Sequence, residues 1–251
     1  MKKIYEKNEL AFALVWIGVY CVLQSLANPI NERIGIAYSA SAVFCILQTV
    51  LLLCFLKKNQ LFTKYGLCKP SVSARRLLYY IPLIVLVTRN FWNGAAINLT
   101  AADTICYIVC MLCVGFVEEI IFRGFLFKAM AKDNVKTAIV ISSVTFGLGH
   151  LLNLVNGSGA ALAENLFQVT GAIAIGFVFV ILFYRGGSIL PCMITHSLIN
   201  MTSAFANETG LTLEKRILFQ IILFVIAVGY AFVLIRSLPR KQAVAAYDDV
   251  N

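Results

Sequence analysis

Eight long apolar stretches, separated by short polar segments, constrain the fold of this chain more than any other feature. They cover residues 10–30, 36–56, 77–93, 104–130, 135–153, 163–184, 188–206 and 214–236. Most of them approach the roughly 20 apolar residues that a helix needs to cross a bilayer. Of the 251 residues, 60% are hydrophobic and 13% are charged, whereas soluble domains carry about 25% charged residues. We therefore expect an all-α, polytopic membrane helix bundle of about eight transmembrane helices, forming a single domain over residues 1–251.

The distribution of basic residues predicts the orientation of this bundle. If the N-terminus lies inside, the inner segments carry 16 of the 21 Lys and Arg residues, and one more, Arg123, lies within a span. The outer segments carry the remaining four, which are Arg33, Arg89, Lys215 and Arg216. Cytoplasmic loops are typically enriched in Lys and Arg, so both termini are expected in the cytoplasm, most simply of a bacterial cell with the chain in its inner membrane. The net charge of +9 then reflects membrane topology, and no nucleic-acid partner is expected, because no basic run alternates with exposed aromatic residues.

Ionisable and strongly polar side chains gather in three of the spans. They are Glu118, Glu119 and Arg123 in the fourth, His150 in the fifth, and His196 and Asn200 in the seventh. Such residues are costly inside a bilayer and usually have a function. One interpretation is purely structural, since Glu119 and Arg123 are four residues apart and can form an ion pair on one helix face. Two adjacent glutamates exceed the need of a single arginine, which favours a chemical role for at least one of them.

The depth of these residues predicts that they converge. With a rise of about 1.5 Å per residue, Glu118, His150 and His196 lie roughly 15, 21 and 16 Å from the inner ends of their spans. Glu118 and His150 can then share a proton and polarise a water molecule. His196 and Asn200 are one helical turn apart, so both can direct donors at a single oxygen. A base with its orienting group, facing a pair of oxyanion donors, is the arrangement expected for hydrolysis of an acyl bond.

Three short motifs resemble those of the CAAX prenyl protease and bacteriocin-processing family of intramembrane proteases (CPBP, or Abi). The family patterns E-E-x-x-x-R, F-x-x-x-H and H-x-x-x-N/D correspond to Glu118-Glu119-Ile-Ile-Phe-Arg123, Phe146-Gly-Leu-Gly-His150 and His196-Ser-Leu-Ile-Asn200. The motifs occur in the family's order and with similar separations. They lie within about 104–206, which we expect to be the catalytic core, whereas the first three spans carry no diagnostic pattern.

This resemblance implies hydrolysis of a peptide bond within or beside the membrane. The substrate would be a membrane-associated, prenylated or leader-bearing peptide or membrane protein, and the lipid bilayer is the other expected partner. By the resemblance, Glu118 and His150 activate the water, and His196 and Asn200 stabilise the tetrahedral oxyanion. The supporting residues of the motifs would be Glu119, Arg123 and Phe146.

Several alternatives stay open at this stage. Glu118, His150 and His196 could ligate zinc with an open position for water, whereas a glutamate mechanism without metal has also been proposed for the family. The motifs do not decide between these chemistries. A non-catalytic protein of bacteriocin self-immunity would keep the same residues to hold its fold. A proton-coupled transporter would use the buried acid and histidines as a relay, but the paired broken helices typical of transporters are not found.

Overall fold

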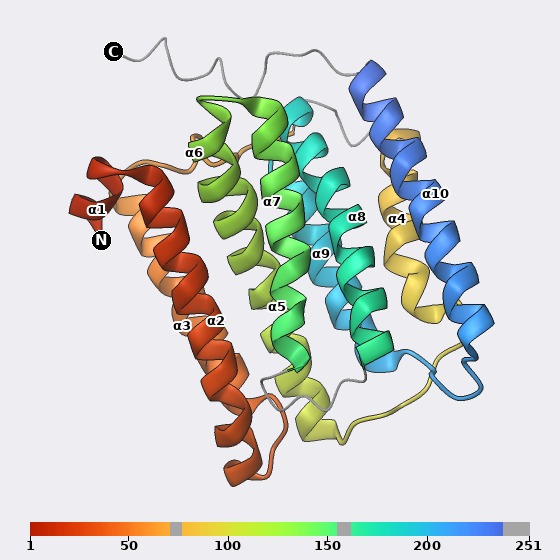
Figure 1. Cartoon of the computed structure of the whole chain (residues 1–251). Coiled ribbons are helices and arrows are strands. Elements are labelled where there is room, and N and C mark those ends of the chain that lie inside the picture. Colours follow the sequence, from red (N-terminus) through yellow and green to blue (C-terminus); the bar gives the residue numbers. More distant parts are fainter. Residues whose placement is uncertain (71–76, 155–161, 238–251) are drawn as a thin grey trace.

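The protein folds into a bundle of helices in a computed structural model that describes residues 1–70, 77–154 and 162–237 (Figure 1). The elements are α1 (Lys2–Lys7), α2 (Glu9–Ile34), α3 (Ser39–Lys58), α4 (Leu77–Val87), η1 (Thr88–Phe91), α5 (Ala101–Glu119), η2 (Ile120–Phe127), α6 (Lys128–Ala131), α7 (Val135–Gly149), η3 (His150–Leu154), α8 (Leu162–Gly186), α9 (Leu190–Thr202), η4 (Ser203–Phe205) and α10 (Leu213–Ser237). Over these described ranges there is no β-strand, only an isolated bridge between Ala95 and Ala206. The expected all-α fold class is confirmed.

All eight apolar stretches contain a helix, but two of these helices are short. Six helical segments are long and apolar enough to cross a membrane: Glu9–Ile34, Ser39–Lys58, Ala101–Ala131, Val135–Leu154, Leu162–Gly186 and Leu213–Ser237. By contrast, α4 and α9 have 11 and 13 residues, which corresponds to roughly 16 and 20 Å along the axis. Each continues only as a short 3₁₀ turn, η1 or η4. The described part of the chain therefore offers six full-length spans rather than eight, and eight complete crossings stay a prediction.

The central helix of the bundle is α8. Within its most apolar 18 residues 67% are buried, compared with 22% for α2 and for α10. The outward faces of these outer helices carry large apolar side chains, and on α10 Val225 and Val228 are each 67% exposed. A surface of this kind is unusual on a protein surrounded by water. It is the surface expected of an integral membrane protein, whose outer helices contact lipid.

Two glycines bring the helices of the site close together. A Cβ atom on Gly115 of α5 would lie 2.1 Å from Ser197 Oγ and 2.8 Å from its backbone nitrogen on α9. A Cβ atom on Gly147 of α7 would lie 2.9 Å from the backbone nitrogen of Ile173 on α8. Small residues permit this close approach of helix backbones in membranes. Each glycine lies three residues before a candidate site residue, and Ser197 directly follows another, so this packing positions the site.

The two ends of the bundle differ in charge. In Figure 1, α1, α6 and the last turn of α10 lie at one end, and the connection from α2 to α3 lies at the other. Twelve described basic residues belong to the first end, hereafter the basic end: Lys2, Lys3, Lys7, Lys57, Lys58, Lys64, Lys69, Lys128, Lys132, Lys136, Arg185 and Arg236. Arg75, Arg76, Arg240 and Lys241 lie outside the described residues. The four basic residues expected outside lie towards the opposite end, and the orientation of the bundle in a membrane stays a prediction.

Candidate active site

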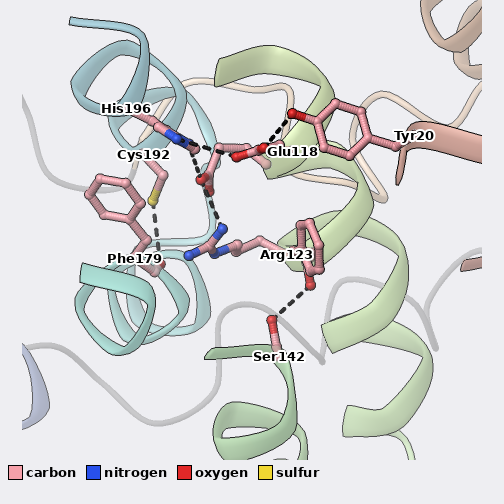
Figure 2. Close-up of polar contacts among 9 residues, drawn as sticks. Tyr20, Glu118, Arg123, Ser142, Phe179, Cys192 and His196 are labelled. Carbon is pink, nitrogen blue, oxygen red and sulfur yellow. Dashed lines mark hydrogen bonds and ion pairs between the residues drawn. The ribbon is translucent and has the colours of Figure 1, made fainter. Parts of the chain in front are cut away.

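The first motif lies where α5 changes into the π-helix η2. Glu118 and Glu119 are the last residues of α5, Arg123 lies in η2, and all three side chains are buried. Arg123 donates to Glu119 Oε1 at 3.0 Å, so the contact expected between these two residues is present (Figure 2). The Phe122 carbonyl of η2 accepts a hydrogen bond from Ser142 Oγ of α7 at 2.8 Å. Short π-helices are rare in proteins, and those that occur are often found at functional sites.

His196 of α9 contacts both glutamates. Its Nδ1 lies 2.8 Å from Glu119 Oε1, and its Nε2 lies 3.4 Å from Glu118 Oε2. One oxygen of Glu119 therefore faces both Arg123 and His196, as the dashed lines in Figure 2 show. The imidazole is 5% exposed, so its orientation is determined by these two carboxylates and the surrounding helices.

This arrangement has a consequence for the proton on His196. A carboxylate only accepts, so Nδ1 carries the proton that is donated to Glu119. In a neutral imidazole Nε2 then has a lone pair, and it faces the acceptor oxygen of Glu118. A protonated imidazole would instead direct an N–H from Nε2 towards Glu118 Oε2, which lies 3.4 Å away. Glu118 and His196 are thus close enough to take part together in general acid–base catalysis.

Tyr20 of α2 is a further residue of the site, and sequence reasoning missed it. Its hydroxyl donates to Glu118 Oε1 at 2.5 Å, across 98 residues of sequence. Figure 2 shows Tyr20 approaching Glu118 from the side opposite His196. The only signal in the sequence is a tyrosine in the middle of an apolar span, which is weak because tyrosine is also common in apolar settings. The hydrogen bond fixes one oxygen of Glu118 and leaves the other directed at His196.

His150 is the first residue of η3, at the end of α7. Its carbonyl accepts a hydrogen bond from Asn165 of α8 at 2.8 Å, and its ring stands edge-to-face with Phe146 at a centroid distance of 5.8 Å. Phe146 thus packs beside His150, and it also contacts the His196 ring at a centroid distance of 5.5 Å. Within the described ranges the His150 ring makes no hydrogen bond, so its nitrogens are available to a ligand or to water.

A single cavity of about 680 Å³ connects the candidate residues. Glu118, His150, His196 and Asn200 all contribute to its wall, together with Tyr20. The structure therefore brings together the four residues to which the sequence assigns chemistry. The pairing within the group differs from the expected one, because the direct neighbour of Glu118 is His196 rather than His150.

Several buried polar atoms of the first motif have no partner. Among the described residues, Glu118 Oε2, Glu119 Oε2 and two nitrogens of Arg123, Nε and Nη2, have no hydrogen-bond partner. The Arg123 guanidinium instead lies over the ring of Phe146, 4.1 Å from its centroid, and near Phe179 at 5.6 Å. Cation–π contacts of this type replace part of the lost solvation of the guanidinium. The unpaired oxygen of Glu118 differs from the others, because Glu118 is the residue among these three that lines the cavity.

The residues do not form a ready metal site as they are arranged. No group of three or more His, Cys, Asp or Glu side chains in the described segments could hold a metal ion. Both nitrogens of His196 face carboxylates, so this side chain would have to reorient to serve as a zinc ligand. The side chains therefore do not fit the zinc site considered for Glu118, His150 and His196.

Comparison with known protein families gives a match, and it covers the segment that contains all three motifs. Residues 100–202 match the family described as type II CAAX prenyl endopeptidase Rce1-like. The resemblance to CAAX-type intramembrane proteases is confirmed. The match over this segment indicates a protease, and proteases of this family act on a peptide or protein in the membrane. Neither the comparison with curated proteins nor that with solved structures gave a match.

Proposed function

We propose that this protein is an intramembrane endopeptidase of a bacterial inner membrane that uses a glutamate-activated water. The observation that carries this proposal is the position of Glu118. Its buried carboxylate lies on the wall of one cavity that His150, His196 and Asn200 also line, within the segment that matches a CAAX endopeptidase family. An isolated carboxylate at this depth would be costly, and the surrounding groups are those that hydrolysis needs.

In the proposed reaction a water molecule lies between Glu118 Oε2 and the His150 ring. Glu118 takes a proton from this water as the oxygen adds to the carbonyl carbon of the scissile peptide bond. The resulting oxyanion accepts hydrogen bonds from Asn200 and from Nε2–H of His196, which are one turn apart on α9. The carbon–nitrogen bond then breaks, and the leaving amine receives the proton held by Glu118.

The remaining contacts hold the reacting groups in position. Tyr20 fixes one oxygen of Glu118, so that the other, which lies 3.4 Å from Nε2 of His196, is the oxygen that takes the proton from the water. Glu119 accepts from Nδ1 of His196, in the way that a carboxylate orients the catalytic histidine of other hydrolases. Arg123 neutralises Glu119, and both of these side chains are fully buried. No step of this mechanism requires a metal ion.

The proposal is tested with Glu118→Gln, which keeps the size of the side chain and removes the carboxylate. Loss of a general base lowers the rate by about 10²–10⁴-fold. The matched control is Glu208→Gln, because Glu208 is an exposed glutamate with a side chain 67% exposed. Membrane peptides from cells carrying the native protein or either variant are compared by mass spectrometry, beside the amount of each protein in the membrane. Cleavage products should disappear in Glu118→Gln alone.

Wild-type cleavage by Glu118→Gln at equal abundance would refute the proposal and favour a binding protein without catalysis. A second experiment, with purified protein and a library of quenched fluorescent peptides, tests whether the reaction depends on a metal ion. Activity that persists in a strong chelator supports the glutamate mechanism, whereas activity that is lost and then restored by zinc supports the metal alternative.

A further inference from the structure

The cavity extends from the catalytic residues in one direction only. On α2 its lining begins at Tyr20 and continues to Gly35 beyond the helix end, and on α5 it runs from Tyr107 to Glu118. On α9 it begins at His196. Because α2 and α9 run away from the basic end and α5 runs towards it (Figure 1), all three helices place the cavity between the catalytic layer and the opposite end.

Towards the basic end the bundle is closed by packed aromatic side chains. The side chains that close it are each at most 2% exposed and belong to one continuous core: Phe12, Phe125, Phe127 and Phe183. Phe125 packs against Phe12 with a centroid distance of 5.1 Å, and Phe127 against Phe183 at 6.1 Å. Within the described residues, the cavity that reaches Glu118 does not extend into this core.

The outer part of the cavity is lined by polar side chains. Gln24, Ser25 and Asn28 follow one another along α2, and Asn153 and Gln168 face the same space from η3 and α8. Some of these amides are hydrogen-bonded within the protein, because Gln24 donates to Cys45 Sγ at 3.0 Å and Asn153 donates to Gln168 Oε1 at 2.9 Å. The lining residues Glu32 and Gly35, at the end of α2, are exposed. We therefore regard this part of the cavity as a vestibule with polar side chains on its wall that opens at the end opposite the basic end.

The charge distribution indicates which side of the membrane this opening faces. The basic end carries twelve described Lys and Arg residues, and the opposite end carries Arg33, Arg89, Lys215 and Arg216. An excess of basic residues marks the cytoplasmic side. With the basic end in the cytoplasm, the vestibule opens to the outer face of the membrane.

We propose that the substrate is an unlipidated peptide segment presented from the outer face of the membrane, an inference that rests on the endopeptidase function proposed above. From Tyr107 to Glu118 the vestibule is about 16 Å deep at 1.5 Å per residue, so an extended segment of roughly five residues spans it. The polar side chains of the vestibule can form hydrogen bonds with the backbone of such a segment. A protein held by a prenyl chain in the cytoplasmic leaflet would meet the closed end of the bundle.

The experiment uses cysteine labelling by a charged maleimide that does not cross membranes. Ser25→Cys places a reporter on the vestibule wall, and the native Cys21 lines the same cavity. Val22→Cys is the matched control, because Val22 lies on the same stretch of α2 but is 57% exposed on its outward face. The native Cys68, a half-buried residue near the basic end, reports the other side of the membrane. Labelled sites are identified by mass spectrometry in intact spheroplasts and in inverted vesicles.

We expect Ser25→Cys to be labelled at least tenfold more in spheroplasts than in inverted vesicles, with the opposite result for Cys68 and no labelling of Val22→Cys. Labelling of Ser25→Cys from the same side as Cys68, or from neither side, would overturn the proposal, as would labelling of Cys68 in spheroplasts. Native Cys21 provides a second reporter if the Ser25 variant accumulates poorly. The labelling pattern does not depend on turnover, so repeating it in Glu118→Gln separates failure of the access route from failure of the endopeptidase function.

Discussion

Replacing Arg123 with methionine tests how the buried ion pair stabilises the bundle. Arg123 and Glu119 are both 0% exposed and 3.0 Å apart. Methionine is flexible and fills irregular space, so it can occupy much of the volume between Phe146 and Phe179. The dominant cost is then the charge of Glu119, which is left buried without its cation. Breaking a buried pair in this way costs about 3–5 kcal/mol, or roughly 150- to 5,000-fold in the ratio of folded to unfolded protein.

A second variant separates this cost from the loss of packing. In Glu119→Gln/Arg123→Met no charge is orphaned, and the glutamine carbonyl can still accept from Nδ1 of His196. We expect the double variant to recover at least half of the lost stability, because an ion pair can often be replaced by neutral groups at little cost. Unfolding is followed in mixed micelles as a function of SDS, with exposed Arg33→Met as the control, expected within about 0.5 kcal/mol of the native protein. Native stability of Arg123→Met, or a double variant no better than the single one, would refute the reasoning.

Three further predictions follow from the site and its packing. Tyr20→Phe should lower kcat about 10- to 100-fold and leave KM within about twofold, because it removes the hydrogen bond that holds Glu118, which is worth roughly 1.5–3 kcal/mol. An equal loss of folded protein and of activity would instead indicate that Tyr20 is purely structural. Asn200→Ala should lower kcat about 10²–10³-fold if it is an oxyanion donor, and an unchanged kcat in the peptide assay would remove it from the mechanism. Gly115→Ala should reduce the stability by about 1–3 kcal/mol, because the new Cβ meets the backbone of α9, whereas Gly229→Ala, with nothing within 4 Å, should be neutral or slightly stabilising in the same SDS titration.

Much of the fold follows from the pattern of apolar residues. Each expected stretch contains a helix, because apolar runs bounded by polar segments determine where a chain enters and leaves the bilayer. The helix ends were less predictable. The stretch expected at 188–206 contains the 13 residues of α9, whose first turn contains Pro191, followed by the short 3₁₀ turn η4. Hydropathy alone does not predict such boundaries.

The site shows what depth can and cannot predict. Counting residues along a span gives the height of Glu118, His150 and His196, and the three residues do line one cavity. Height says nothing about rotation around the helix axis, so it does not identify His196 rather than His150 as the neighbour of Glu118. The π-helix η2 adds to this difficulty, because a wider turn changes the direction of every side chain relative to an ideal α-helix. Tyr20 was missed because it comes from a span without a motif.

The ion pair between Glu119 and Arg123 also has a consequence for how the protein is made. Both residues are on one helical segment, so they can neutralise each other as soon as that segment leaves the ribosome and enters the membrane. His196, the other partner of Glu119, is synthesised 77 residues later. The nascent chain therefore inserts without an orphaned charge and yet lacks a working site until α9 docks. The contact between Glu119 and His196, and with it the complete candidate site, therefore forms only after most of the bundle has been synthesised.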